Sequence, residues 1–458
     1  MKRQEDYFMK KRKVMAILLT AACISSLCGG LTVRADGKQK LTITYRPVTT
    51  QQGDTYEEYI NKTYENWDKK DDVELVLNKI ESTDSDYLTK IQLLMQDDSQ
   101  CGDLVYEDTF QLTSDAAAAG YLANLDDYLA DYDAWNDGKS YVEATKAATY
   151  YDGSYYGIPS CTDSRGLVVN TEVLEAAGLG ADWQPASWDE LLDGCRQIKE
   201  KCEDVIPFWM ILGKANGEAA SMNGYEMILY GTEDGNDSLY DTKEEKWVVS
   251  SDSIKDANQF VATLFDEELT GEYSEMLDTG SDGYACDYLR QGKLGIYLVG
   301  SWFPANYQEG GSYEWADYAD VLKFIPMPTE SGDGTITMSG GWAWAVPAKS
   351  ENQELAFEFL TEMMKPENYY TYITSESNLP TIDMSEYPDV LSKPFMETAE
   401  SFLDNALFRP KSEVYSSVST YIAQMSEDAA TSMDAEGAMN TYKDNVISVV
   451  GEENTIEH

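Results

Sequence analysis

The single histidine of this sequence is its last residue, His458. Binding or catalysis must therefore depend mainly on acidic, basic and aromatic side chains. This composition excludes Ser-His-Asp and Cys-His catalysis and imidazole metal sites. The sequence also contains no Walker A loop and no dinucleotide-binding GxGxxG motif. An enzyme built from it would depend on paired carboxylates, which favours glycoside hydrolysis.

Two carboxylates, Glu107 and Asp108, directly follow a predicted strand at 103–106. Ligands of open α/β sheets bind at the carboxyl ends of the strands, so both residues are candidates for a site. Asp108 also precedes a predicted helix, where an aspartate is a common N-cap. Binding and capping therefore remain alternatives for Asp108.

The stretch from 148 to 170 supplies a further carboxylate and a cation. An Asp-Gly pair between aromatic pairs predicts a hairpin, and Pro159 makes the residue before it extended. We expect the chain to leave one half of the protein here and to enter the other. Asp163 and Arg165 would then stand in the cleft between the halves, with a salt bridge at the hinge as the alternative for Arg165.

Two tryptophans follow short runs of small residues at predicted strand ends. Trp302 comes after Gly300-Ser301, and Trp342 comes after Gly340-Gly341. Glycine lets a backbone approach a ligand closely, and tryptophan offers a large flat apolar face. Most of the other tryptophans are expected in the core.

Alternating elements must position these residues. Predicted strands at 41–45, 73–77 and 103–106 alternate with helices, which indicates a parallel sheet covered by helices. Capping-box patterns at 187–190 and 350–353 open further helices. A helix at 253–265, a strand at 294–299 and helices at 393–406, 415–433 and 436–449 complete the outline. The length of 458 residues suggests two or three domains.

The N-terminus predicts export. A basic run at 10–13 precedes an apolar stretch to about residue 31, and Val33-Arg34-Ala35 predicts signal-peptide cleavage after Ala35. Cys23 and Cys28 fit a lipoprotein signal poorly, so a lipid anchor stays an open alternative to free secretion. The formal charge of -48 argues against nucleic acid and anionic membranes as partners. The sparse cysteines predict no disulfide framework, and we expect no metal and no cofactor.

Several short motifs occur in a characteristic order along almost the whole mature chain, from about 41 to 449. After the signal peptide, they are Gly102-Asp103-Leu104-Val105 with Asp108, Tyr151-Asp152-Gly153 through Pro159, Gly166-Leu167-Val168-Val169-Asn170, Ser187-Trp188-Asp189-Glu190-Leu191, Gly300-Ser301-Trp302, Gly341-Trp342-Ala343-Trp344, the helix after Ser350, Leu379-Pro380-Thr381 and Arg409-Pro410. In this order they resemble the extracellular solute-binding proteins of ABC importers, in the carbohydrate-binding branch that includes the maltose- and trehalose-binding proteins.

The resemblance implies an α/β, two-lobed fold of the periplasmic-binding-protein type II, in which each lobe is a sheet flanked by helices. The chain would cross between the lobes in a three-segment hinge, near 159–163, 335–341 and 378–389. Residues 36–160 with 340–384 would form lobe 1, and residues 161–339 with 385–450 would form lobe 2. Closure of the hinge around ligand would create the form that a membrane permease recognises.

The resemblance also implies a ligand site. A sugar has an apolar C–H face and a rim of hydroxyls, and it needs a flat aromatic and charged hydrogen-bonding groups. The residues that match the family positions or lie beside them are Asp108, Asp163, Trp302, Gly341, Trp342, Arg409, Glu107 and Arg165. Tyr225 and Glu226, in an exposed-looking Asn-Gly-Tyr-Glu stretch of the middle region, are further candidates.

The implied function is that of a non-enzymatic binding subunit. It would capture a mono- or oligosaccharide outside the cytoplasmic membrane as a monomer, and would deliver it to the transmembrane subunits of an ABC permease. The alternative is a secreted carbohydrate-active hydrolase that uses two carboxylates, for example Glu107 or Asp108 with Asp163.

Overall fold

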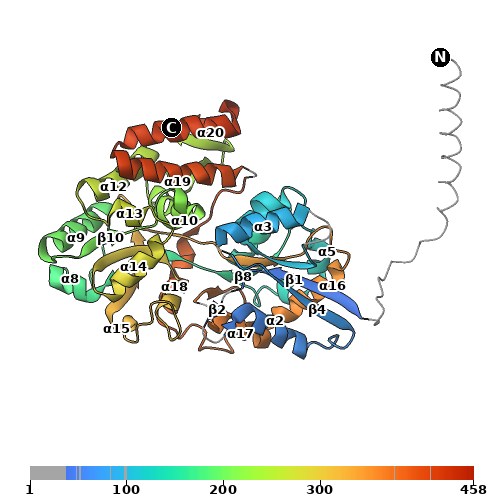
Figure 1. Ribbon diagram of the computed structural model, residues 1–458. Helices are drawn as coiled ribbons and strands as arrows, with labels where there is room; N and C mark the ends of the chain where they lie inside the picture. The colour runs from blue at the N-terminus through green and yellow to red at the C-terminus, as the bar shows by residue number, and fades with distance from the viewer. Residues whose placement is uncertain are drawn as a thin grey trace, which may run out of the picture. The chain divides into compact units, whose positions relative to one another are not determined.

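The protein is described by a computed structural model that covers residues 38–458 except 48, 51–52, 83, 97–100, 376 and 413 (Figure 1). The predicted signal peptide, with Cys23 and Cys28, lies outside the described residues. Contacts divide the chain into two compact units. The smaller is described at 38–40 and 68–74, where the backbone N–H of Gln39 donates to the carbonyl of Asp72 (3.0 Å). Residues 41–67 and 75–458 form the larger unit, which holds every predicted site residue.

A six-stranded sheet forms from both early and late parts of the chain, in the order β18-β8-β17-β5-β1-β4. Its strands are β1 (Gln39–Tyr45), β4 (Val73–Lys79), β5 (Leu104–Asp108), β8 (Ile158–Thr162), β17 (Trp342–Ala345) and β18 (Leu379–Pro380). The alternation of β1 buries Leu41, Ile43 and Tyr45, as its period of two requires. The predicted strands at 41–45, 73–77 and 103–106 are confirmed.

The sheet is mixed rather than parallel, so the prediction of a parallel sheet is correct only for its first strands. β1 pairs parallel with β5, whereas β17 runs antiparallel to both β5 and β8. The late strand β17 returns from another part of the molecule and enters the sheet in the opposite direction. Mixed sheets of this kind are common among large sheets.

The helices of the half that contains the six-stranded sheet are α2 (Thr55–Asn66), α3 (Asp84–Gln96), α4 (Thr109–Gln111), α5 (Asp126–Ala130), α6 (Asp133–Asn136), α7 (Glu143–Lys146), α16 (Gln353–Met363) and α17 (Pro366–Ser375).

A second sheet of four strands has the order β10-β13-β9-β14. Its strands are β9 (Arg165–Asn170), β10 (Ile206–Trp209), β13 (Leu294–Gly300) and β14 (Leu322–Ile325). All seven residues of β13 are buried, because both faces of this sheet are covered. The main helices of this half are α8 (Thr171–Ala177), α9 (Trp188–Lys201), α12 (Asp252–Asp266), α14 (Ser281–Arg290) and α18 (Met396–Phe402).

Two long helices lie near the C-terminus of the chain. They are α19 (Tyr415–Ser432) and α20 (Ala435–Val450), which pack against each other and against α12 (Figure 1). The predictions of helices at 415–433, 436–449 and 253–265 are confirmed. The helix predicted at 393–406 is shorter, because α18 covers only Met396–Phe402 and is followed by a 3₁₀ turn at Leu403–Asn405 and a short strand at Ala406–Leu407.

Short connections join the two sheets. β8 leads into β9 through Asp163 and Ser164, and β16 (Thr335–Met338) leads into β17 through 339–341. After β18 the chain reaches α18 and then β19 (Ala406–Leu407), which pairs with β16. These segments are tied together: Thr162 Oγ1 lies 2.9 Å from Ser339 Oγ, and Ser164 Oγ donates to the carbonyl of Ala399 (2.8 Å).

The remaining short elements are β2 (Thr49–Thr50), β3 (Gly53–Asp54), β6 (Tyr150–Tyr151), β7 (Ser154–Tyr155), β11 (Tyr240–Asp241), β12 (Lys246–Ser250), β15 (Met327–Pro328), β20 (Thr455–Glu457), α10 (Glu218–Ala220), α11 (Glu226–Leu229), α13 (Tyr273–Met276), α15 (Tyr318–Val321), the π-turns η1 (Leu112–Ala117) and η4 (Ser221–Tyr225), and the 3₁₀ turns η2 (Ala147–Thr149), η3 (Lys214–Asn216), η5 (Gly235–Asp237), η6 (Phe303–Asn306), η7 (Leu403–Asn405) and η8 (Glu452–Asn454). The hairpin predicted around Asp152-Gly153 is confirmed by the pairing of β6 with β7. In the part of the chain that is described, each helix is too short or too polar to span a membrane.

Candidate ligand-binding site

Asp108 combines the two roles that its sequence position suggests. Its Oδ1 accepts from the backbone N–H of Phe110 (3.0 Å) and of Gln111 (3.1 Å), which makes it the N-cap of α4. Both oxygens of the same carboxylate also accept from Arg409 Nη2, at 3.1 and 3.2 Å. The carboxylate at the end of β5 therefore orders its own helix and holds a cation.

Arg409 lies buried between two carboxylates. Its second guanidinium nitrogen, Nη1, donates to Glu218 Oε1 at 2.8 Å, and the guanidinium carbon lies 4.3 Å from the centre of the Phe110 ring. Burial by itself would lower the pKa of Arg409, but the charges of Asp108 and Glu218 raise it above its ordinary value. Arg409 is thus a fixed positive charge with hydrogen bonds to both acids.

Asp163 and Arg165 form a second ion pair, with 2.5 Å between Asp163 Oδ1 and Arg165 Nη1. The same Oδ1 accepts from the backbone N–H of Gly340 (3.1 Å). Arg165 Nε donates to Asn223 Oδ1 at 2.7 Å, and Nη1 also donates to the carbonyl of Met338 at 3.0 Å. Burial lowers the pKa of Arg165, and the charge of Asp163 opposes that effect. Arg165 therefore fastens the connection before β9 to the connection before β17.

Both tryptophans contact neighbouring rings or cations, and both remain partly exposed. The guanidinium carbon of Arg165 lies 5.1 Å from the centre of the Trp302 ring, which is a cation–π contact. Trp342 stacks on Tyr106, with ring centres 5.1 Å apart and planes 7° apart. The structure thus places Trp302 beside the Asp163–Arg165 pair, and Trp342 opposite Asp108 in the β5–β17 pairing.

The glycines before these tryptophans are required by geometry. A Cβ on Gly300 would lie 1.9 Å from the Trp302 ring. Gly341 has φ of +117°, and a Cβ there would lie 2.0 Å from the carbonyl oxygen of Cys161. The carbonyl of Gly341 accepts from the backbone N–H of Thr109 at 3.0 Å, which joins β17 to the start of α4.

Three of the candidate residues are wholly buried. Glu107 is 0% exposed, and neither of its carboxyl oxygens has a hydrogen-bond partner among the described residues. Its burial and the charges of Asp108 and Asp115 raise its pKa well above the ordinary value. Tyr225 donates to Asn258 Oδ1 (2.7 Å) inside the core. Glu226 contacts Tyr415 at 2.6 Å. The structure therefore brings together Asp108, Asp163, Arg165, Trp302, Gly341, Trp342 and Arg409, while Glu107, Tyr225 and Glu226 lie behind them.

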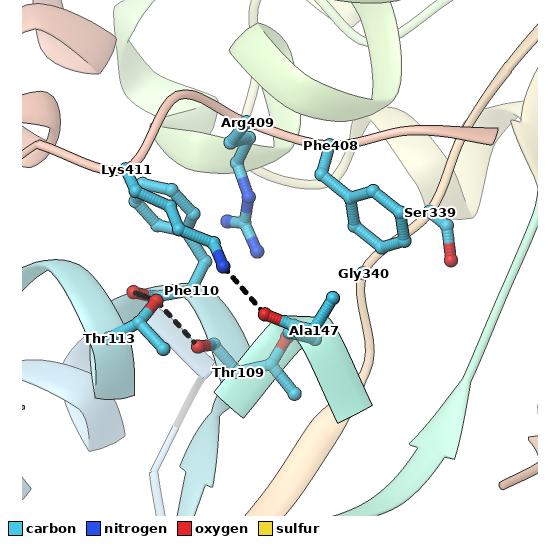
Figure 2. Close-up of a pocket in the computed structure, with 10 residues that line it drawn as sticks. Thr109, Phe110, Thr113, Ala147, Ser339, Gly340, Phe408, Arg409 and Lys411 are labelled. Atoms are coloured by element: carbon cyan, nitrogen blue, oxygen red, sulfur yellow. Dashed lines mark hydrogen bonds between the residues drawn. The ribbon is translucent and has the colours of Figure 1, made fainter. Parts of the chain in front are cut away.

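A cavity of about 80 Å³ adjoins Arg409 and Gly340. Figure 2 shows Phe408, Arg409 and Lys411 on one side of it and Thr109, Phe110 and Ala147 on the other. Lys411 Nζ donates to the carbonyls of Ala147 (2.6 Å) and Tyr150 (2.9 Å). The cavity is smaller than the roughly 300–1,000 Å³ that is usual for ligand pockets, because these side chains reach across it.

A larger hollow of about 550 Å³ lies elsewhere, lined by residues from 132–141, 361–366 and 382–386. It contains none of the residues that the sequence singles out. Size alone does not identify the site, and the smaller cavity is favoured because it is lined by Phe110, Phe408 and Arg409, the buried cation that bonds to Asp108.

Sequence reasoning missed the residues that support the two arginines. Glu218 holds Arg409, and Asn223 holds Arg165. Both lie in a stretch of short turns, α10 and η4, rather than at a strand end. A short π-helix such as η4 has no sequence signature of its own, so no local signal marks Glu218 or Asn223. The described residues contain no cluster of three or more potential metal ligands.

The chain belongs to the bacterial extracellular solute-binding proteins, whose family model matches residues 46–370. It is also similar to the arabinooligosaccharide-binding protein of Halalkalibacterium halodurans, with 23% identity over 233 residues. That match covers 48% of this chain and 46% of the relative, so the chain aligns with about half of the length of the curated relative.

Solved structures share the fold over nearly the whole chain. The GacH receptor of Streptomyces glaucescens matches with a TM-score of 0.72 and 21% identity, over 90% of this chain and 99% of the other. Maltose-bound MalE3 of T. maritima matches with a TM-score of 0.73 and 20% identity, over 90% of this chain and 100% of the other. A solute-binding protein of Thermotoga lettingae, bound with α-D-tagatose, has a TM-score of 0.72 and 22% identity, over 90% and 100% of the two chains.

These likenesses confirm the predicted fold class, a two-lobed α/β fold of the periplasmic-binding-protein type. The family confirms the prediction of a solute-binding protein rather than an enzyme, and it places the protein outside the cytoplasmic membrane. It gives no support to the hydrolase alternative.

Proposed function

We propose that this protein is the carbohydrate-binding subunit of an ABC importer, and that it captures a mono- or oligosaccharide between its lobes for a membrane permease. The observation that carries the proposal is the meeting of two partly exposed tryptophans, Trp302 and Trp342, with the ion pairs Asp163–Arg165 and Asp108–Arg409. Similar proteins are described as binding arabinooligosaccharide, acarbose or maltose, which supports a carbohydrate ligand.

The chemistry of the site fits a sugar. Trp302 and Trp342 provide flat apolar faces for the C–H side of a pyranose ring. Asp108, Asp163 and Arg409 provide charged hydrogen-bonding groups for the hydroxyl rim, where charge-assisted bonds are the strong ones. Arg165 and Gly341 are assigned to shaping the site, and Glu107, Tyr225 and Glu226 are not assigned ligand contacts, because all three are fully buried.

We assign residues 36–160 with 340–384 to lobe 1 and residues 161–339 with 385–450 to lobe 2. The bonds that tie the three connecting segments together, such as Thr162 to Ser339 and Ser164 to Ala399, support a hinge at their common location. On this assignment Arg409, Lys411 and Ser416 of lobe 2 bond to Asp108, Ala147 and Asp115 of lobe 1. These are the bonds of a closed cleft, and a hinge opening would admit the ligand.

The remaining features of the proposal concern the whole protein. We propose that the N-terminal 35 residues direct export, that the mature protein acts as a monomer, and that the permease recognises its closed form. A lipid anchor at Cys23 or Cys28 is the alternative to free secretion. Mass spectrometry of the N-terminal peptide from the native host would distinguish cleavage after Ala35 from lipidation.

A thermal-shift screen over a panel of mono- and oligosaccharides tests the ligand class, because a ligand that binds only the folded state raises Tm by mass action. A sugar that raises Tm should also change tryptophan fluorescence. Trp302→Ala should weaken its binding by at least tenfold, since one stacking face is worth about 1.5 kcal/mol or more. The matched control is Trp183→Ala, a partly exposed tryptophan in the loop between α8 and α9.

Unchanged affinity in Trp302→Ala would contradict the stacking role. Release of reducing ends from a bound oligosaccharide would contradict the binding function itself. Binding of a non-sugar solute alone, with the whole panel silent, would replace the carbohydrate assignment while leaving the family intact.

A further inference from the structure

Four side chains behind the cleft form an unbroken line of short polar contacts. Glu226 Oε1 lies 2.6 Å from the hydroxyl of Tyr415, which lies 2.9 Å from Glu218 Oε1, and that oxygen accepts from Arg409 Nη1 at 2.8 Å. The members come from α11, α19, α10 and the segment before α19. The line therefore leads from the interior to the cation that faces the proposed ligand.

The number of hydrogens in this line fixes the protonation state of one acid. An ionised carboxylate only accepts hydrogen bonds, and a phenol has a single hydrogen to donate. If both Glu226 and Glu218 were ionised, Tyr415 would face two acceptors at 2.6 and 2.9 Å with one hydrogen between them. A second proton on one of the carboxyls satisfies both contacts.

Glu226 is the acid that carries this proton. Glu218 accepts from Arg409 and from the hydroxyl of Ser419, and its side chain is 31% exposed, which favours its charged form. Glu226 is 0% exposed, and its Oε2 has no hydrogen-bond partner among the described residues. Burial without a hydrogen-bond partner strongly disfavours the ionised form of a carboxylate. With Glu226 neutral, its O–H donates to Tyr415 Oη and the Tyr415 O–H donates to Glu218.

We propose that Glu226 is a neutral carboxylic acid and a positioning residue, which sets the place of the Arg409 guanidinium through Tyr415 and Glu218. The assignment of Arg409 to ligand binding rests on the proposed function. The hydrogen-bond chain from Glu226 through Tyr415 and Glu218 to Arg409, called the relay below, does not. The relay gives Glu226 a role other than the direct ligand contact that its sequence position suggests.

The surroundings of Glu226 support a neutral acid near pH 7. Its burial, and then the charge of Glu218 on α10, raise the pKa of Glu226 to about 8. Tyr415 on α19, which could donate to an ionised Glu226, and the charges of Arg409 and Arg165 oppose this rise without cancelling it. The other titratable groups that face it are Tyr230, after α11, and Tyr442 on α20, whose pKa values are themselves raised by burial.

Loss of the proton would change the hold on Arg409. An ionised Glu226 would compete with Glu218 for the single Tyr415 hydrogen, and it would add a negative charge on the same side of the guanidinium. Arg409 would then be drawn away from Asp108, its partner at the end of β5. The position of Arg409 should therefore follow the titration of Glu226.

Carboxyl ¹³C NMR of the full, unliganded chain with labelled glutamate tests the protonation state. We expect a glutamate resonance that titrates with a midpoint near pH 8, besides that of Glu107, whose pKa burial also raises. Glu226→Gln should remove this resonance and leave that of Glu107 in place. The control is Glu275→Gln, which removes another glutamate bonded to a tyrosine, the partly buried contact with Tyr288 (2.9 Å). If the resonance that Glu226→Gln removes titrates near the ordinary value of 4.5, the proposal is wrong.

Guanidinium ¹⁵N resonances of Arg409, assigned with Arg409→Lys, test the positioning. They should shift with the same midpoint as the Glu226 carboxyl, and Glu226→Gln should make them independent of pH, since its amide replaces the O–H donor. Tyr415→Phe should uncouple the two signals while leaving the Glu226 midpoint high. Arginine signals that ignore pH in the wild-type protein would overturn the relay. None of these readings depends on a sugar, so they stand or fall separately from the ligand class.

Discussion

Single residues set the shape of the connection before β17. Gly341 has φ of +117°, and its missing side chain leaves room for the carbonyl of Cys161. Any other residue would meet backbone strain and a steric clash together, and the clash is with backbone rather than with a side chain that can move. The connection therefore tolerates only glycine at this position.

Gly341→Ala should lower the free energy of unfolding by at least about 2 kcal/mol, because strain of about 1–3 kcal/mol adds to the displacement of Cys161. Urea unfolding measures it. The matched control is Gly120→Ala, which also has positive φ (+72°) but no atom within 4 Å of the added Cβ. It should lose only about 1 kcal/mol. Equal losses in the two variants would contradict the steric argument.

Glu226 should leave a signature in the dependence of stability on pH. Its folded-state pKa of about 8 lies above its ordinary value of 4.5, so between these values the folded state keeps a proton that the unfolded state has released. The free energy of unfolding contributed by this group falls as pH rises through that window, by at most about 1.4 kcal/mol per pH unit. Above about pH 8 the contribution is constant.

The measurement is urea unfolding of wild type and Glu226→Gln from pH 5 to pH 9. The variant has no proton to lose at this position, so its stability relative to wild type should rise steadily from pH 5 to 8. A constant difference between the two proteins would show that Glu226 is ionised throughout. Taking the difference removes the parallel effect of Glu107, whose pKa is also raised by burial.

At the scale of elements, short sequence motifs predicted strand ends and helix caps better than they predicted the hydrogen-bonding partners of the site residues. The end of β5 and the Gly-Ser-Trp and Gly-Gly-Trp steps could be read from the sequence, because glycine and strand-end acids have local geometric meaning. Glu226 was a candidate for ligand contact, yet it is buried because α11 packs on η4 and α12, and η4 packs on α19. Glu218 could not be found, since its partner Arg409 lies 191 positions away.

The two capping-box patterns show the same limit. At 187–190, Ser187 Oγ accepts from Glu190 N–H, and Glu190 Oε2 accepts from Ala186 N–H. At 350–353 the pattern fails, because Ser350 Oγ donates to Asp103 and α16 begins only at Gln353 without a side-chain cap. A buried aspartate from the neighbouring sheet therefore outcompetes the local cap.

Ser187→Ala should cost about 1 kcal/mol of unfolding free energy, the usual value for loss of an N-cap. Since α9 lies outside the cluster around Trp302 and Arg409, the affinity for any sugar found by the screen should stay the same. Ser187→Asn is the control, because asparagine caps equally well and should restore the stability. Equal destabilisation by both changes would assign the effect to packing rather than to the cap.

At the scale of the whole molecule, the bonds between the proposed lobes decide how readily ligand enters. Lys411 Nζ, which donates to Ala147 and Tyr150 of lobe 1, belongs to the segment that also carries Arg409. Hydrogen bonds to a charged group are worth about 1.5–3 kcal/mol each. This lysine can therefore stabilise the closed form without contacting a sugar through its amine.

Lys411→Met should shift the unliganded protein toward the open form. Its radius of gyration from small-angle X-ray scattering should increase, and the apparent affinity for the bound sugar should fall about tenfold, since only the closed fraction retains ligand. The loss should appear in the dissociation rate. Lys365→Met is the control, because the Lys365 amine pairs with Glu362, three residues before it in the same proposed lobe. If both the radius of gyration and the affinity are unchanged, Lys411 does not stabilise the closed form. If the radius increases and the affinity is unchanged, closure of the lobes contributes nothing to retention of the ligand.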